Sequence, residues 1–231
     1  MKIIFTNISG IDIESPKPAS KFLPEWYKNT NSYVNNEKKP IGDGTTPATI
    51  KRCIPVLDAI TGGYIIPLPI DLYVRVKENK NGEKDQYFEW PSLDFIEFHP
   101  ISQAPKHPLS KPYPFPKFMN PWSIKTPKGY STLFVQPFHR ESIFTILPGI
   151  VDTDIYTAPV NFPFVINDPN FEGFIKKGTP MVQVIPIKRD KWTMEIGNQE
   201  DFFEQNSITQ KIKSKFFDSY KTMFWDKKEY L

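Results

Sequence analysis

Proline and aromatic residues are both abundant in this chain of 231 residues, and the combination restricts its fold more than any other sequence feature. There are 24 prolines, about twice the usual share, beside 19 Phe, 10 Tyr and 5 Trp. Disordered proline-rich chains carry few aromatic residues, because they bury too little apolar surface to fold. Proline is also excluded from helix interiors and from central strand positions. We therefore expect a mainly β protein with strands that end at prolines and with long ordered loops.

The length suits one large domain, and we expect residues 1–231 to form a single β-rich domain. The 29 Lys and Arg against 26 Asp and Glu leave a net charge of +3, too balanced to indicate nucleic acid or a membrane surface. The single cysteine, Cys53, excludes a disulfide framework and a cysteine zinc site within the chain. No apolar run approaches the roughly 20 residues that span a bilayer, and the first residues turn polar too early for a secretion signal. These features predict a soluble cytoplasmic protein without a membrane partner.

Alternation of apolar and polar residues with a period of two predicts strands in two parts of the chain. In the first part, residues 71–77 and 86–90 flank an Asn-Gly turn, which is typical of a hairpin. The second part contains four stretches separated by Gly, Pro, Asp and Asn, namely 129–135, 143–147, 160–166 and 180–187. We expect these four strands to share one core. Its buried side chains should include Phe134, Ile146, Ile150, Phe164, Val182 and Val184.

Three further segments have a recognisable pattern. Residues 19–27 predict a short N-terminal helix, with Pro24 at its first helical position. Residues 91–128 are dense in proline and aromatic residues without a regular period, which predicts a long ordered loop, and such loops are often functional. Residues from about 207 to 227 carry apolar residues at spacings of three and four, which predicts an amphipathic helix docked on the domain. Its buried stripe should contain Ile212, Phe216, Tyr220 and Phe224.

Four short motifs follow one another between residues 126 and 187. They are Thr126-Pro127-Lys128-Gly129-Tyr130, Pro137-Phe138-His139-Arg140-Glu141-Ser142, Pro148-Gly149-Ile150-Val151-Asp152-Thr153-Asp154-Ile155-Tyr156 and Ile175-Lys176-Lys177-Gly178-Thr179-Pro180-Met181-Val182-Gln183. In this order they resemble the core of the dUTPase/dCTP-deaminase family of nucleotide-processing enzymes. The resemblance implies a dUTPase-like antiparallel sandwich or barrel, and a jelly roll is the alternative.

The same resemblance implies roles for particular residues. Asp152 corresponds to the carboxylate that orients and deprotonates water, and Tyr156 to the ring that packs against the sugar. Arg140 and Ser142 correspond to the phosphate-binding turn, and Mg²⁺ would bridge the phosphates. The candidate ligand-binding residues are therefore Arg140, Ser142, Asp154, Tyr156 and Gln183.

The chain also departs from the family pattern. One extra residue lies between Asp152 and Tyr156, and Phe138 and His139 occupy a turn where small residues would let the backbone approach phosphate. The glycine-rich C-terminal arm of the family is absent. We therefore expect no hydrolysis at an enzymatic rate and no cofactor, with Mg²⁺ required only if the chain processes nucleotides. The alternative interpretation is that Asp152 and Asp154 cap a turn.

Other stretches resemble a functionally uncharacterised family of bacteriophage and bacterial proteins of similar length. These stretches are Pro18-Ala19, Pro24-Glu25-Trp26-Tyr27, Lys51-Arg52-Cys53-Ile54-Pro55, Gly63-Tyr64-Ile65-Ile66 and Asn120-Pro121-Trp122. The resemblance implies a viral protein that acts in the host cytoplasm, or in the virion if it is structural.

The three histidines and the basic residues are further candidate sites. Imidazoles at His99, His107 and His139 are a weak alternative for a zinc or iron site, because no metal-ligand spacing joins them. Lysines among the aromatic residues of 106–128 would suit single-stranded nucleic acid, but the same pattern keeps an ordered loop soluble, so nucleic acid is an unlikely partner.

Three functions are therefore compatible with the sequence. The first is an accessory protein that binds a small ligand or a host protein on a dUTPase-like scaffold without turnover. The second is a deoxynucleoside triphosphate hydrolase-like enzyme, and the third is a virion structural protein. Each is compatible with a homo-oligomer.

Overall fold

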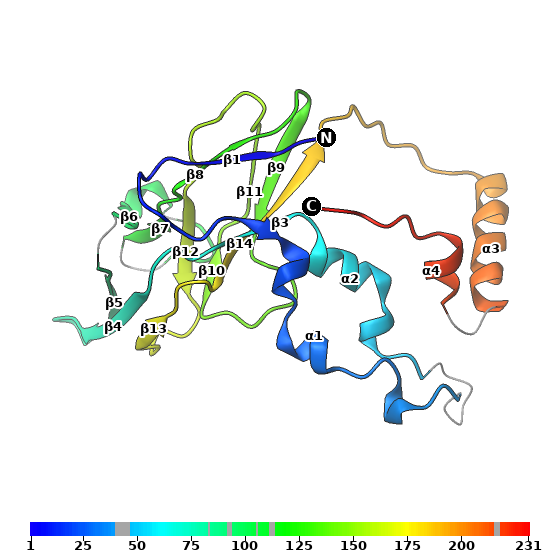
Figure 1. Ribbon diagram of the computed structural model, residues 1–231, viewed down its shortest axis with the longest axis horizontal. Coiled ribbons are helices and arrows are strands. Elements are labelled where there is room, and N and C mark those ends of the chain that lie inside the picture. Colours follow the sequence, from blue (N-terminus) through cyan, green and yellow to red (C-terminus); the bar gives the residue numbers. More distant parts are fainter. Residues whose placement is uncertain (40–46, 83, 92–93, 105, 111–113, 215–217) are drawn as a thin grey trace. The chain divides into compact units, whose positions relative to one another are not determined.

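The computed structural model describes residues 1–39, 47–82, 84–91, 94–104, 106–110, 114–214 and 218–231 (Figure 1). Contacts between backbone segments divide the chain into two compact units. We call residues 1–22 with 63–189 the β unit, and residues 23–62 with 190–231 the helical unit. None of the helices in these described ranges is both long and apolar enough to cross a bilayer.

The β unit consists of antiparallel strands, as the sequence predicts for the fold class. Its strands are β1 (Ile4–Asn7), β2 (Lys17–Pro18), β3 (Tyr64–Pro67), β4 (Leu72–Glu78), β5 (Lys84–Glu89), β6 (Ile96–His99), β7 (Phe115–Phe118), β8 (Trp122–Lys125), β9 (Tyr130–Val135), β10 (Phe144–Ile146), β11 (Gly149–Val151), β12 (Phe162–Ile166), β13 (Gly173–Ile175) and β14 (Pro180–Lys188). Short 3-10 turns cover Ala19–Phe22 and Ile101–Gln103.

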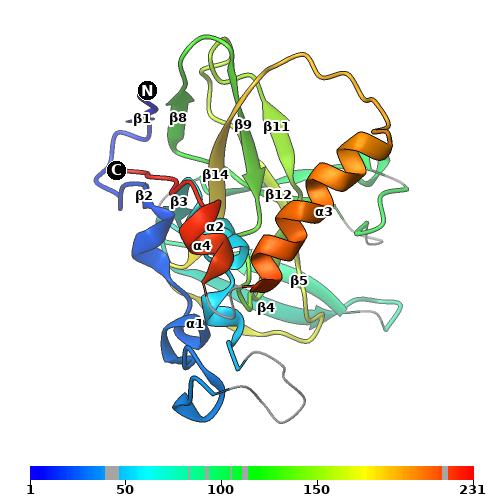
Figure 2. The ribbon, with the colours of Figure 1, turned by 90° about the vertical axis from the view of Figure 1, so that its right-hand side faces the viewer.

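These strands form several sheets (Figures 1 and 2). The largest has the order β11-β9-β14-β3-β2, and a second has the order β10-β12-β7-β6. A three-stranded sheet, β13-β4-β5, and the pair β1-β8 complete the unit. No closed barrel forms among the described strands. Strands β2 and β3 end at prolines and β14 begins at one, as expected of a proline-rich β protein.

One hydrophobic core lies within the β unit and joins its sheets. Phe164 on β12 stacks on Phe118 of β7, with ring centroids 3.7 Å apart. Phe134 of the largest sheet contacts Phe162 of the second sheet at 5.4 Å. Five of the six side chains predicted to be buried lie in this core; they are Phe134, Ile146, Phe164, Val182 and Val184.

The sixth prediction, burial of Ile150, is wrong, because this side chain is 63% exposed. Ile150 lies on β11, the edge strand of the largest sheet, opposite Leu133 on β9. Successive side chains of a strand point to opposite faces. Since Phe134 points into the core, Leu133 and its partner Ile150 point to the other face.

The structure confirms the predicted hairpin and the four predicted strands. β4 and β5 pair antiparallel, and the turn between them has Gly82 at φ +78°. The four stretches correspond to β9, β10, β12 and β14, and the short strands β11 and β13 lie between them.

The loop predicted over 91–128 is wrong in part, since this range contains β6, β7 and β8. Pro116 lies inside β7, between two neighbouring strands, which a central strand normally excludes. It is tolerated here because β12 pairs only with Lys117 and Phe118, beyond the proline. Strands this short, interrupted by proline, leave no period of two in the sequence.

The helical unit contains α1 (Glu25–Asn29), α2 (Ile54–Thr61), α3 (Gln199–Ser214) and α4 (Ser219–Met223), with 3-10 turns at Val34–Asn36 and Ile50–Arg52. The predicted N-terminal helix is present as α1, but Pro24 precedes it as the N-cap residue instead of opening it. Sequence reasoning did not identify α2. Trp225 donates from its indole nitrogen to the carboxylate of Asp58, at 3.0 and 3.1 Å, so the C-terminal segment is tied to α2.

The prediction of one C-terminal helix over 207–227 is wrong in part, because the helical residues of this range belong to two helices, α3 and α4. α3 begins at Gln199, and the chain turns at Asp218, whose φ of +59° is outside the helical range, before α4 begins. The predicted buried stripe is also wrong for Ile212, Tyr220 and Phe224, which are 36%, 41% and 40% exposed. Phe216 lies outside the described residues.

Candidate functional site

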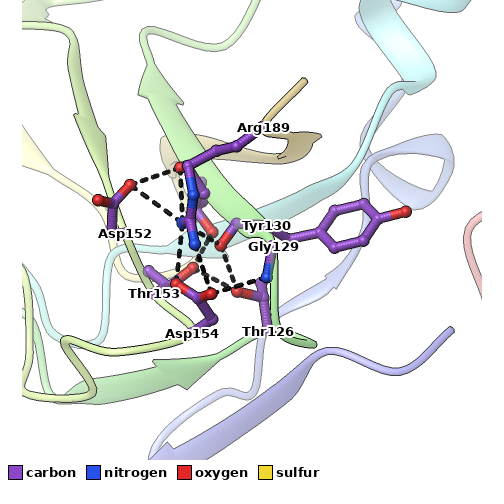
Figure 3. A network of polar contacts seen from close by, with 9 residues as sticks. Thr126, Gly129, Tyr130, Asp152, Thr153, Asp154 and Arg189 are labelled. Atoms are coloured by element: carbon purple, nitrogen blue, oxygen red, sulfur yellow. Dashed lines mark hydrogen bonds and ion pairs between the residues drawn. The ribbon is translucent and has the colours of Figure 1, made fainter. Parts of the chain in front are cut away.

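The turn after β11 forms a polar cluster at the start of β9 (Figure 3). Its centre is Thr153, which is fully buried. The hydroxyl of Thr153 lies 2.8 Å from that of Thr126 and 2.7 Å from that of Thr132. The carbonyl oxygen of Asp152 accepts from the backbone N–H groups of Ile155 and Tyr156, and these two bonds close the turn. The motif from Pro148 to Tyr156 therefore consists of β11 and a compact turn that is held by buried hydroxyls.

Asp154 and Arg189 form a bidentate ion pair in this cluster (Figure 3). The two carboxylate oxygens of Asp154 accept from the guanidinium at 2.8 and 2.5 Å. The backbone N–H of Gly129 donates to the same carboxylate at 2.8 Å, and the side chain of Asp154 is only 3% exposed. These donors, Arg189 above all, lower the pKa of Asp154 from its ordinary value of 3.8 to about 2.

Gly129 is required in the turn that supplies this donor. Its φ is +84°, in the left-handed region that favours glycine. The N–H of Tyr130 donates to the carbonyl of Pro127, which closes the turn into β9. The ring of Tyr130 points away from the cluster (Figure 3), and only its carbonyl takes part, accepting from Thr126 and Arg189.

Asp152 is the exposed carboxylate of the cluster, with 57% of its side chain accessible. One oxygen, Oδ1, accepts from the hydroxyl of Ser131 at 2.6 Å and lies 3.1 Å from the guanidinium of Arg189. Within the described residues, no hydrogen bond to its other oxygen, Oδ2, is found. This oxygen is the group of the cluster that can accept a hydrogen bond from a ligand.

The low pKa of Asp154 predicts a specific acid sensitivity. Because the pKa is lower in the folded than in the unfolded chain, ionised Asp154 stabilises the fold above about pH 4, and this contribution is lost as the pH falls towards about 2. The free energy of unfolding of the native protein, measured by urea titration, should therefore exceed that of Asp154→Asn at neutral pH. The difference should shrink between about pH 4 and about pH 2. A difference that stays constant over this range would contradict the prediction.

The phosphate turn and Gln183, a further candidate ligand-binding residue, lie towards the other end of β9. Gln183 is paired with Val135, four residues along β9 from Ser131, which is roughly 13 Å in an extended strand. The side chain of Gln183 is fully buried and accepts from the backbone N–H of Phe138 at 3.0 Å. This N–H, which the resemblance would offer to phosphate, is thus engaged by the protein itself.

Arg140 and Ser142 are also engaged within the β unit. The guanidinium of Arg140 donates to the carbonyl of Phe22, and burial lowers its pKa. The hydroxyl of Ser142 accepts from the N–H of Phe144 at 3.3 Å, next to the start of β10. Of the predicted site residues, the structure therefore brings together Asp152, Asp154 and the turn to Tyr156, but not Arg140, Ser142 or Gln183.

Tyr156 is 52% exposed at the end of the turn. β11 ends at Val151, so the residues after it no longer alternate between two faces of a strand. The extra residue before Tyr156 therefore lies within the turn and does not change which side of a strand Tyr156 faces.

The three histidines lie in separate segments, and two of them have partners close in sequence. His99 Nδ1 lies 2.5 Å from the side-chain oxygen of Gln103. His107 Nδ1 accepts from the N–H of Leu109 at 3.1 Å. His139 has a φ of +53° in the connection between β9 and β10. No group of three or more His, Cys, Asp and Glu that could hold a metal occurs in the described part of the chain.

Sequence reasoning missed Ser131, Thr132 and Arg189 in the cluster. Arg189 follows Asp154 by 35 positions, and no local spacing links the two. What brings them together is the pairing of β14 with β9, which sets Lys188 opposite Tyr130 at the start of β9.

A second feature was missed on the outer face of the sheet β13-β4-β5. Leu72, Val74 and Ile175 of this sheet point into the core, so the alternate residues point outward. We call the outward set, together with Lys176 over the ring of Phe174, the aromatic face; it contains Tyr73, Arg75, Lys77, Asp85, Tyr87, Glu89, Phe174 and Lys176. The period of two in residues 71–77 was the signal, because it already separates Tyr73, Arg75 and Lys77 from the apolar positions.

Contacts across the aromatic face hold its side chains in place. Tyr73 and Phe174 meet edge to face with centroids 4.9 Å apart. The guanidinium of Arg75 lies 5.4 Å from the Tyr73 ring and pairs with Glu89 at 2.7 Å. The ammonium of Lys176 lies 4.3 Å from the ring of Phe174. Phe174 nevertheless remains 54% exposed and Tyr87 remains 45% exposed.

Comparison of the chain with models of known protein families finds no match, and no curated protein matches it either.

Proposed function

We propose that this chain is a phage-type accessory protein that binds a host protein through the aromatic face and does not turn over nucleotides. Binding of a host protein is supported by the composition and exposure of that face. The absence of nucleotide turnover is supported by the pairing of Arg189 within the protein itself. We also propose that the two largest sheets, which share one core, correspond to a dUTPase-like scaffold that acts in the host cytoplasm.

The cations and N–H groups that nucleotide hydrolysis would require are already paired within the protein. Hydrolysis between phosphates needs cations and backbone N–H groups that are free to meet the developing charge. Both terminal nitrogens of the Arg189 guanidinium donate to Asp154, and the N–H of Phe138 donates to the side-chain oxygen of Gln183. Asp152 has an exposed oxygen that could accept a proton, but this carboxylate is hydrogen-bonded to Ser131, whereas the phosphate turn follows Val135 at the other end of β9, roughly 13 Å along the strand.

The side chains exposed on the aromatic face are of the kinds that bind other proteins. Tyr, Phe and Arg are enriched at the centres of protein interfaces, and large exposed aromatic residues add contact area at little entropic cost. Arg75 pairs with Glu89 and Lys176 with Asp71, and the carboxylate of Glu172 accepts from the hydroxyl of Tyr73. A face with both signs of charge suits a protein surface better than the uniformly negative backbone of nucleic acid.

The absence of turnover is tested by pyrophosphate release from dUTP and dCTP with Mg²⁺. We expect the native protein and Asp152→Asn to release pyrophosphate equally, at the uncatalysed rate. This variant retains the size of the side chain but removes the carboxylate. A turnover of about 1 s⁻¹ that disappears in Asp152→Asn would overturn the proposal and establish the nucleotide-processing alternative.

The binding surface is tested with two exposed substitutions and a matched control. A host protein captured from bacterial lysate is purified and titrated against the native chain and each variant by calorimetry. Tyr87→Ala and Phe174→Ala should each weaken the binding by about thirtyfold or more, the effect of removing an interface hot spot. Ile101→Ala removes a side chain of similar exposure, 47%, outside the face and should leave the affinity unchanged. Equal affinities for all four proteins would contradict the proposal.

A further inference from the structure

The segment between β14 and α3 exposes three large apolar side chains in a regular pattern. Trp192, Met194 and Ile196 are 87%, 90% and 87% exposed. Lys191, Thr193 and Glu195 occupy the alternate positions, and no helix or strand is formed between residues 189 and 198. We call residues 190–198 the arm. It has the pattern of a strand with one apolar face, but it has no sheet to pair with in the chain as described.

The apolar area of the arm is large for an unpartnered surface. A side chain of this size carries on the order of 150–250 Å² of accessible area, so the three expose about 500 Å². Contiguous apolar patches of a few hundred Å² on a protein surface mark interaction sites. Residues 191–197 of the arm contain no proline, so each carries a backbone N–H group of the kind that a strand ladder uses. The N–H of Asn198 donates to the carboxylate of Asp201.

A suitable acceptor is present in the β unit. β11 is an edge strand of the largest sheet, and one side of its backbone is therefore unpaired by other strands. Three exposed apolar side chains lie on β11 and in the turn after it: Ile150, Ile155 and Tyr156, which are 63%, 78% and 52% exposed. An edge strand with exposed apolar side chains is a template for the addition of another strand.

The position where the arm begins favours a second copy of this chain as the partner. The arm leaves the sheet directly after Arg189, which is held to Asp152 and Asp154 in the turn that follows β11. The arm follows β14, and in the order β11-β9-β14 this strand lies two strands from β11, roughly 10 Å away. Nine residues reach about 30 Å when extended. A two-fold axis beside β11 would thus bring each arm to the other copy's edge, as an isologous interface requires.

The expected contact area also suits a stable dimer. Two arms contribute about 1,000 Å² of apolar area, and the two edges that they cover contribute a similar amount. The total of about 2,000 Å² reaches the size of specific, stable interfaces. We propose that the chain forms a dimer in which the arm of each copy adds as a strand to the free edge of β11 in the other copy.

The oligomeric state of the full chain tests this proposal, by sedimentation equilibrium. The native protein should have twice the mass of one chain, 26.8 kDa. A variant with Trp192→Ser, Met194→Ser and Ile196→Ser should have the mass of one chain, and so should Ile150→Lys on the acceptor edge. Ile101→Ser, at another exposed apolar position, should remain dimeric. All three variants alter exposed side chains, so circular dichroism should show an unchanged fold.

Several outcomes would overturn the proposal. One is a native protein that remains monomeric, including one whose arm binds an unrelated protein instead. A second is a dimer that persists in the arm variant. A third is an arm variant that dissociates while Ile150→Lys stays dimeric, since β11 would then not be the acceptor.

Cross-linking distinguishes an exchanged arm from any other dimer. In a Cys53→Ala background, Met194→Cys chains are mixed with Ile150→Cys chains and treated with a short bis-maleimide. We expect a covalent dimer from the mixture and none from either variant alone. Equal cross-linking in all three samples would overturn the proposal.

Discussion

Gly63→Ala is expected to destabilise the protein severely. Gly63 has a φ of +71°, which costs a residue with a Cβ about 1–2 kcal/mol. The new Cβ would also lie 2.1 Å from the carbonyl oxygen of Val184, a backbone atom of β14. Val184 is paired with Tyr64, the residue after Gly63, so β14 can move away only by separating from β3 at the centre of the largest sheet. Overpacking adds about 1–3 kcal/mol, and the melting temperature should fall by roughly 5–20 °C.

Gly10→Ala is the matched control for this prediction. Gly10 has nearly the same φ, +73°, but a Cβ there would meet no atom within 4 Å. Its melting temperature should therefore fall only by the conformational cost, roughly 2–8 °C. Thermal denaturation followed by circular dichroism compares the two variants. Equal shifts would show that the contact with Val184 is relieved without cost.

Phe164→Ala is expected to have an effect of similar size through a different mechanism. Phe164 is fully buried, lies parallel to Phe118 at 3.7 Å, and meets Phe88 edge to face at 5.4 Å. Removal of a buried phenylalanine ring costs about 3–5 kcal/mol, because it leaves a cavity in a packed core. The melting temperature should fall by roughly 6–20 °C. A decrease in melting temperature as small as that expected from truncating an exposed ring would contradict the packing described for this core.

Two further variants complete this experiment. Phe118→Ala with Phe164→Ala should cost less than the sum of the single substitutions, since each removes part of the same contact. Phe174→Ala, which removes a ring that is 54% exposed, should change the melting temperature little. Because this variant is also expected to lose partner binding, it separates a defect in the proposed function from a defect in folding.

Much of the architecture of the β unit can be predicted from the sequence. Repeated alternation with Gly, Pro and Asp turns identifies β9, β10, β12 and β14, and it also identifies the hairpin of β4 and β5. Five core residues follow from the same pattern, because period-two alternation separates the two faces of a strand wherever one face is buried. The short strands β6, β7 and β8 escape this reasoning, since three or four residues with an inserted proline show no period.

Alternation alone cannot decide which side of an edge strand faces solvent. Ile150 illustrates this limit: it belongs to an apolar stretch, yet the register of β11 against β9 turns it outward. The C-terminal segment illustrates another limit. Spacings of three and four continue through Asp218, but a single backbone conformation there separates α4 from the chain before it.

In the candidate site, the local sequence and the tertiary structure determine different features. The sequence alone indicated that Asp152 and Asp154 lie in one motif, and it contained the alternative that they hold a turn. It carried no local sign that Arg189 pairs with Asp154, or that Gln183 lies at the far end of β9. Those relations depend on the pairing of β14 with β9, which joins residues more than 45 positions apart. Local preference determines where strands form, whereas the packing of distant strands determines their register and thus which polar groups meet.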